Sequence, residues 1–292
     1  MVKLNTSVRR FVTAVLAAGA VAATSAAVAS AAPPATAVEY VNLGDSYSAG
    51  SGVQPAAPGS YSQCAQSNVN YAHLIARRSG MRLTDVSCGG AKTDDFYRAQ
   101  YPGLRPQLDA LSPRTGLVTF MIGGNDGDIF GTTVAKCVAA AITSPGAYAP
   151  CQQRYGTSTS HQVQTQTYPR LMRAFAAVRQ HAPRARVAVV NYPWIAPTTP
   201  QPCPGFPVAP GDLPYTHGIQ ATLNDALRRA AAQTGVTYVD VAAASVGHDS
   251  CRPKGVRWVE PLISDVQTVT VHPNALGERE MADVTMRTLA AR

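Results

Sequence analysis

Short apolar runs alternate along the chain with longer segments whose apolar residues recur every three or four positions. The apolar runs predict buried strands over residues 39–43, 83–86, 117–122, 186–192 and 237–241. The periodic segments predict helices over residues 70–78, 105–111, 168–180, 216–234 and 274–289. This alternation favours a parallel sheet covered by helices on both faces, in which sites gather beyond the carboxyl ends of the strands.

Two stretches interrupt the alternation, residues 139–167 and the proline-rich residues 193–214. We expect both to be long surface loops of the same domain, because each contains a cysteine, Cys151 or Cys203, that can tether it. The sequence therefore predicts a single domain over residues 32–292.

The N-terminus has the features of a secretory signal. Lys3, Arg9 and Arg10 precede an apolar, alanine-rich run over residues 11–28, and the small residues 29–31 follow it. This order predicts a cleaved signal peptide over residues 1–31 and a secreted, extracellular protein. The alternative, an uncleaved membrane helix, is disfavoured because prolines follow directly and no basic cluster does.

Charge limits the partners of the mature chain. Cleavage removes three of the 25 basic residues and none of the 17 acidic ones, so the formal net charge falls from +8 to +5. The remaining basic residues are scattered, which argues against nucleic-acid binding and permits transient association with lipid surfaces. We expect a monomer.

Six cysteines stand at positions 64, 88, 137, 151, 203 and 251. No C-x-x-C pair or histidine cluster accompanies them, so we expect disulfides and no metal site. Pairing neighbours would join Cys64 to Cys88, Cys137 to Cys151 and Cys203 to Cys251. Six cysteines also allow other connectivities, and their spacing does not choose among them.

A serine follows the first predicted strand, within the glycine-rich residues 44–52. A serine that begins a helical turn at a sheet edge can offer both its Oγ and its own N–H to a reacting carbonyl group. The alternative is an ordinary turn or helix-cap serine. The segment is not the G-x-S-x-G elbow, because Ser48 occupies the position of the second glycine.

Three further blocks follow later strands. Gly90 lies within residues 87–91 and Asn125 within residues 123–126, each shortly after a predicted strand. Taken alone, either block could also be an ordinary turn. Residues 271–278 place His272 at the start of the last helix, where it could act as a general base.

These four blocks, in this order, resemble those of the SGNH/GDSL hydrolases. The resemblance implies a three-layer α/β/α, flavodoxin-like fold with a five-stranded parallel sheet. It also implies Ser46 as nucleophile, His272 as base, and an oxyanion hole made by Ser46, Gly90 and Asn125. An acyl-enzyme mechanism without a cofactor would follow.

The chain departs from the family pattern beside the histidine. Most members have an aspartate three residues before it, whereas this chain has Val269. Asp265 is one alternative. A branch of secreted, Streptomyces-type lipases and esterases, which this chain resembles in its Arg-Trp-Val-Glu stretch at residues 257–260, orients the histidine with a main-chain carbonyl. That branch implies the carbonyl of Val269 or Thr270 here, and three sequential disulfides.

The resemblance leaves the substrate open. We expect a lipase or carboxylesterase that acts on lipid-like esters, with a phospholipase A or a polysaccharide deacetylase as the enzymatic alternative. A secreted, non-catalytic binding protein is the third hypothesis. Apolar residues of the predicted loops are candidates to line an acyl groove, namely Ile129, Phe130, Tyr148, Trp194 and Phe206.

Overall fold

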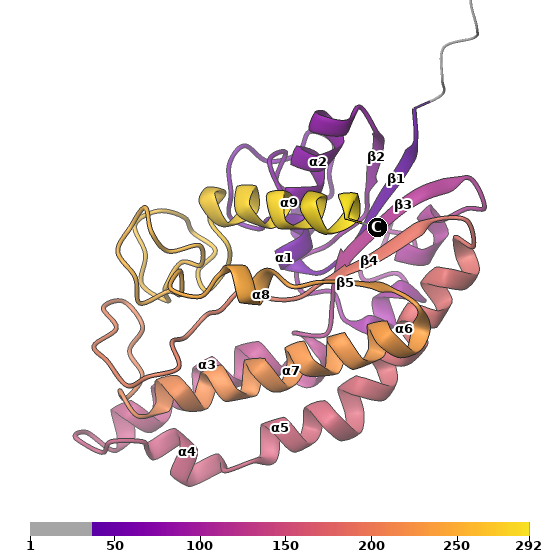
Figure 1. Cartoon of the computed structure of the whole chain (residues 1–292). Coiled ribbons are helices and arrows are strands. Elements are labelled where there is room, and N and C mark those ends of the chain that lie inside the picture. The colour runs from indigo at the N-terminus through magenta and orange to yellow at the C-terminus, as the bar shows by residue number, and fades with distance from the viewer. Residues whose placement is uncertain (1–36, 292) are drawn as a thin grey trace, which may run out of the picture. The chain divides into compact units, whose positions relative to one another are not determined.

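A five-stranded parallel sheet forms the centre of the computed structural model, which describes residues 37–291 (Figure 1). Its strands are β1 (Glu39–Gly44), β2 (Arg82–Asp85), β3 (Thr115–Met121), β4 (Arg186–Val190) and β5 (Thr237–Val239). The strand order is β2-β1-β3-β4-β5, and all four pairings are parallel. This is the flavodoxin-like order, so the predicted fold class is confirmed.

Helices cover both faces of the sheet. In Figure 1, α2 (Tyr71–Ser79) and α9 (Ala275–Ala290) lie on one side, and α6 (Tyr168–His181) and α7 (Asp212–Thr234) lie on the other. Each helix buries an apolar stripe, as the sequence periodicity predicts. In the core, Phe120 of β3 packs edge-on against Phe96 and against Phe175 of α6.

The expected loop at residues 139–167 is wrong, because most of this stretch is helical. It contains the end of α3 (Ile129–Thr143), then α4 (Pro150–Tyr155), α5 (Ser158–Gln162) and a π-helical turn (Val163–Thr167). Pro150 stands in the first turn of α4, where a missing N–H costs no intrahelical bond. The expected helix at 105–111 is only a 3₁₀ turn, Gln107–Ala110.

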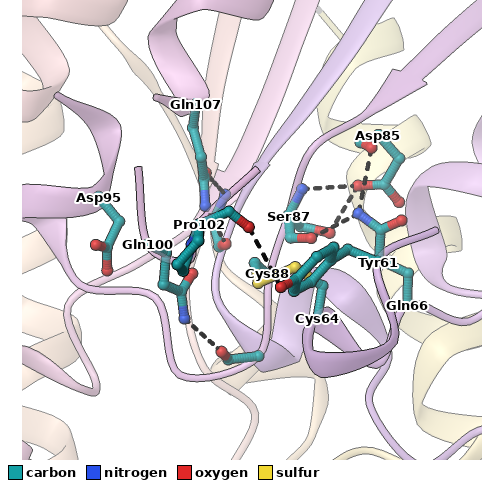
Figure 2. Close-up of a disulfide and its surroundings, with 12 residues drawn as sticks. Tyr61, Cys64, Gln66, Asp85, Ser87, Cys88, Asp95, Gln100, Pro102 and Gln107 are labelled. Carbon is teal, nitrogen blue, oxygen red and sulfur yellow. Dashed lines mark hydrogen bonds between the residues drawn. A yellow bond between two sulfur atoms is a disulfide. The ribbon is translucent and has the colours of Figure 1, made fainter. Parts of the chain in front are cut away.

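Three disulfides join neighbouring cysteines, with the sequential pairing that the resemblance implies: Cys64–Cys88, Cys137–Cys151 and Cys203–Cys251. The first, drawn in Figure 2, fastens the segment after β2 to the 3₁₀ helix Ser62–Cys64. The second links α3 to α4, and the third holds the proline-rich segment before α7. No described helix is long and apolar enough to cross a membrane.

The carboxyl ends of β1 and β3 mark the point where the strand order reverses. Here the N–H of Asp45 donates to the carbonyl of Met121 at 2.9 Å, and Gly44 has a φ of +115°. A side chain at Gly44 would place its Cβ 2.2 Å from the Met121 carbonyl oxygen, so only glycine fits. The predicted signal peptide lies outside the described residues.

Candidate active site

Ser46 stands at this switch point, as the first residue of the one-turn helix α1 (Ser46–Ala49). Asp45 caps this helix by accepting a hydrogen bond from the N–H of Tyr47 at 3.0 Å. The Oγ of Ser46 lies 2.7 Å from Nε2 of His272. The structure therefore brings together two residues that are 226 positions apart and that the sequence analysis singled out as nucleophile and base.

His272 is held by the segment that leads into α9. Residues 258–260 pair with residues 271–274 through main-chain hydrogen bonds. The N–H of Glu260 donates to the carbonyl of His272, and the N–H of Val271 donates to the carbonyl of Glu260. Asn274 caps α9 by accepting from two N–H groups. A Cβ at Gly277 would approach the Trp258 carbonyl to 2.5 Å, which explains the glycine of this block.

A main-chain carbonyl orients the imidazole. Nδ1 of His272 lies 2.7 Å from the carbonyl oxygen of Thr270, so Nδ1 carries the proton and Nε2 is free to accept one from Ser46. The Val269 carbonyl is engaged instead by the side-chain amide of Gln267 at 2.8 Å. Of the two carbonyls that the resemblance left open, the one that faces the ring is that of Thr270.

Asp265 does not approach the histidine. Its carboxylate is exposed and lies 3.2 Å from Nζ of Lys254, an ion pair that lowers the pKa of Asp265. The carboxyl group of Asp45 is beside Ser46 in the chain, but it accepts from the Tyr192 hydroxyl at 2.5 Å and from the Tyr47 N–H. Neither carboxylate therefore contacts the ring of His272.

Tyr47 supports the segment that orients His272, a role that the sequence analysis missed. Its hydroxyl donates to the Val271 carbonyl at 2.6 Å, and its ring packs 5.0 Å from the imidazole. Val271 has a φ of +58°, which is costly for a β-branched residue and persists because the surroundings hold it. The only signal for Tyr47 in the sequence was its place beside Ser46.

The surrounding protein shifts the pKa values of two groups at the site, His272 and Asp45. Desolvation by the surrounding protein lowers the pKa of His272 below its ordinary value, and the hydrogen bond to Thr270 opposes this shift only in part. Burial raises the pKa of Asp45 to about 7, although hydrogen bonds from Tyr192 and Tyr47 oppose the shift. No carboxylate beside the ring, among the residues that the structure describes, counteracts the fall at His272.

We expect the acid limb of kcat/KM to have its inflection below pH 6.5, the ordinary pKa of histidine. A base works only when it is deprotonated, so a lowered pKa extends activity toward acid pH. The measurement is kcat/KM for p-nitrophenyl butyrate against pH. Asp45→Asn is the control, because an acid limb that vanishes in this variant would belong to Asp45.

The oxyanion candidates come from the ends of β2 and β3. The Asn125 amide donates to the Ala91 carbonyl at 3.1 Å, which uses one of its two N–H bonds and leaves the other for a ligand. The N–H of Gly90 makes no hydrogen bond within residues 37–291. Asp126, after β3, accepts hydrogen bonds from the N–H and the hydroxyl of Thr93, after β2, and so joins the two segments that carry Asn125 and Gly90.

An apolar cavity of about 600 Å³ opens beside Ser46, Asn125 and His272. Helix α3 lines it with four residues spaced by about one helical turn, Phe130, Val134, Val138 and Ile142. The histidine segment, residues 258–274, adds Leu262 and Val271. Of the five residues expected to line an acyl groove, only Phe130 does so. Ile129 is buried in the core, Tyr148 is exposed outside the cavity, and Trp194 stacks on His217.

Phe206 is likewise buried elsewhere, away from this cavity. Among residues 37–291, no three His, Cys, Asp or Glu side chains are grouped to hold a metal ion. Besides the hydroxyl of Tyr47, the polar side chains that line the apolar cavity are those of Asp45, Ser46, Asn125, Thr270 and His272.

A serine and a carbonyl-oriented imidazole at the carboxyl edge of a flavodoxin-like sheet are the arrangement of an SGNH-type hydrolase. The sequence matches the GDSL-like Lipase/Acylhydrolase family over residues 43–280. The chain belongs to this family, and it is a carboxylic ester hydrolase.

Individual relatives agree with this assignment. The chain is 53% identical to Lipase 2 of Streptomyces coelicolor over 254 residues, which cover 86% of each chain. Its structure is similar to that of phospholipase A1 from Streptomyces albidoflavus, with a TM-score of 0.71, 29% identity and coverage of 87% of this chain and 99% of the other. An extracellular lipase from Streptomyces rimosus gives the same TM-score and coverage at 26% identity.

Proposed function

We propose that this protein is a secreted lipase or esterase that hydrolyses long acyl esters through an acyl-enzyme on Ser46. The observation that carries the proposal is the apolar cavity of about 600 Å³ that ends at Ser46 and His272. An apolar cavity with few polar groups at one end suits a substrate with a long hydrocarbon part and one reacting ester.

The chemistry is acyl transfer in two steps. Ser46 Oγ attacks the ester carbonyl carbon while its proton passes to Nε2 of His272. The N–H groups of Ser46 and Gly90 and the amide of Asn125 stabilise the oxyanion. His272 then protonates the departing alkoxide. Water attacks the acyl-enzyme, gives a proton to His272 and releases the carboxylic acid, and Ser46 regains its proton.

Thr270 substitutes for the usual acid in one respect only. Its carbonyl fixes the tautomer and orientation of His272, but as a neutral group it stabilises the imidazolium less than a carboxylate would. We therefore propose a Ser46–His272 dyad with a main-chain orienting group.

A phospholipase A activity is the second candidate, supported by the similarity to the phospholipase A1 of Streptomyces albidoflavus. The same acyl cavity would serve both activities, and the head group would then lie toward solvent. A polysaccharide deacetylase is less well supported, because an acetyl group would leave most of the apolar cavity unfilled.

Apolar side chains are exposed on both segments that line the cavity. Ile142 of α3 is 71% exposed, and Ile263, next to Leu262, is 69% exposed. We propose that these residues contact lipid surfaces transiently while an acyl chain enters. Secretion agrees with the three disulfides, which persist in an oxidising compartment, and with the predicted signal peptide ahead of a single domain.

The decisive assay compares p-nitrophenyl esters from acetate to palmitate with a phospholipid and an acetylated xylan. We expect kcat/KM to rise with chain length, because each buried methylene adds transition-state binding. Hydrolysis of the phospholipid at comparable rates would select the phospholipase candidate. Activity confined to acetylated xylan would overturn the proposal.

The substitution Val138→Trp is expected to shorten the cavity and shift the preference toward short esters. Residues 130 and 142 lie about 18 Å apart along α3 at 1.5 Å per residue, so an indole at Val138 blocks the distal half. We expect kcat/KM for palmitate to fall about ten- to a hundredfold, with butyrate nearly unchanged. Thr132→Trp, at an exposed α3 position outside the cavity, is the matched control, and an equal loss there would contradict the assignment.

A further inference from the structure

We infer that Gln100 is a positioning residue that aims the Gly90 N–H into the oxyanion hole. Its side-chain amide donates to the carbonyl oxygen of Gly89 at 2.7 Å (Figure 2). This inference rests on the proposed function, because it assigns a support to one of the oxyanion donors. Gln100 belongs to none of the four family blocks of the sequence.

The reason lies in the geometry of one peptide unit. The Gly89 carbonyl and the Gly90 N–H belong to the same planar trans peptide, so they point in opposite directions. A donor that holds the carbonyl on one side therefore directs the N–H to the other side. Gln100 approaches from the side that faces a separate, more polar cavity lined by Gln107 and Asp95, away from the acyl cavity.

The neighbouring hydrogen bonds show which glycine N–H is free. The N–H of Gly89 donates to the Cys64 carbonyl at 2.9 Å, and that of Cys88 donates to the Gly44 carbonyl at 2.9 Å. Among the described residues, the N–H of Gly90 has no such partner. Gly90 has a φ of +77°, a conformation that glycine tolerates and that can change at little cost. A glycine peptide of this kind needs an external group to keep one orientation.

The chain around Gln100 is anchored at both ends of the contact. The Cys64–Cys88 disulfide holds the residue before Gly89, and Tyr61 stacks on Tyr101, the residue after Gln100. The Oε1 atom of Gln100 is buried and has no hydrogen-bond partner within residues 37–291. The amide thus acts at this place through its donor alone, which glutamate can replace only when it is protonated.

The test uses Gln100→Glu and Gln100→Ala with a p-nitrophenyl ester at pH 8. An ionised glutamate repels the Gly89 carbonyl, so we expect kcat to fall about ten- to a hundredfold in Gln100→Glu with KM within about twofold. The inhibition constant of a trifluoromethyl ketone, whose adduct carries an oxyanion, should rise by a similar factor. Gln100→Ala should show the same pattern more weakly.

A pH profile separates positioning from general damage. Protonation of the carboxylate introduced in Gln100→Glu restores a donor, so the ratio of variant to wild-type kcat should rise as the pH falls toward about 5. Tyr61→Phe, which removes a nearby hydrogen bond to the Pro102 carbonyl, is the matched control and should leave kcat and inhibition unchanged.

Two outcomes would overturn the inference. One is wild-type kcat and inhibition in both Gln100 variants while Asn125→Ala loses activity, since the hole would then work without Gln100. The other is a lower unfolding temperature together with a lower kcat in Gln100→Glu, when the ratio of variant to wild-type kcat does not change with pH. Failure of the proposed function itself would show differently, as full activity in Ser46→Ala.

Discussion

Replacing Ser46 by alanine is expected to lower kcat by about 10⁴-fold or more for every ester that the enzyme hydrolyses. The loss is large because the substitution removes the only atom that forms the acyl-enzyme, and the remaining donors can stabilise only a slow attack by water. Ester hydrolysis and labelling by a fluorophosphonate probe, followed by mass spectrometry of the modified peptide, measure the effect. Probe attachment elsewhere in the folded variant would contradict the assignment.

Ser48 offers a matched control two residues away. Its hydroxyl accepts from the Met121 N–H at 2.8 Å inside the protein and contacts no part of the cavity. Ser48→Ala leaves this buried N–H without a partner, so we expect a lower unfolding temperature but undiminished labelling. Ser46→Ala should show the reverse, with normal unfolding and no labelling.

The second large effect is expected from His272→Ala, with a loss in kcat of about 10⁴-fold or more, against a change within about twofold in Asp265→Asn. The imidazole contacts Ser46 and Thr270, whereas the Asp265 carboxylate is 77% exposed beside Lys254. The two variants are compared in kcat for the same p-nitrophenyl ester.

The contrast is decisive because the aspartate of a true triad contributes about 10⁴-fold to kcat. A loss of that size in Asp265→Asn would mean that the carboxylate moves to the histidine during turnover. Lys254→Ala is a useful companion, since it frees Asp265 from its ion pair and should also leave kcat unchanged in a dyad.

Most of the sheet was predictable because β1, β3, β4 and β5 each contain an apolar-rich run, whereas β2, with the sequence Arg-Leu-Thr-Asp, has only one apolar residue. Helix α3 was not, since its apolar residues serve two faces: Ile129, Cys137 and Ala140 are buried, while Val134, Val138 and Ile142 line the cavity. A helix without one polar face gives no clear three-to-four periodicity. Most of the residues that line the apolar cavity were missed for the same reason, because α3 forms one of its walls and only Phe130 was named in advance.

In the candidate site, the residues that lie in the four sequence blocks were predictable. The residues whose role depends on a contact between distant parts of the chain were not. Ser46, Gly90, Asn125 and His272 were named because their blocks resemble those of the SGNH/GDSL hydrolases, and each block follows a strand or leads into a helix. The hydroxyl of Tyr47 reaches a carbonyl 224 positions away. Such a contact depends on how the histidine segment folds, which residue types alone do not determine.

The carbonyl that orients His272 has a consequence for mutation and evolution. Every amino acid carries a main-chain carbonyl, so no single codon change can delete this atom as a change of aspartate to alanine deletes a carboxylate. A saturation library should therefore tolerate most side chains at Thr270, and its inactive clones should gather at the residues that shape the segment, such as Gln267 and Val271. The orienting function is inherited as a loop conformation, not as an amino acid.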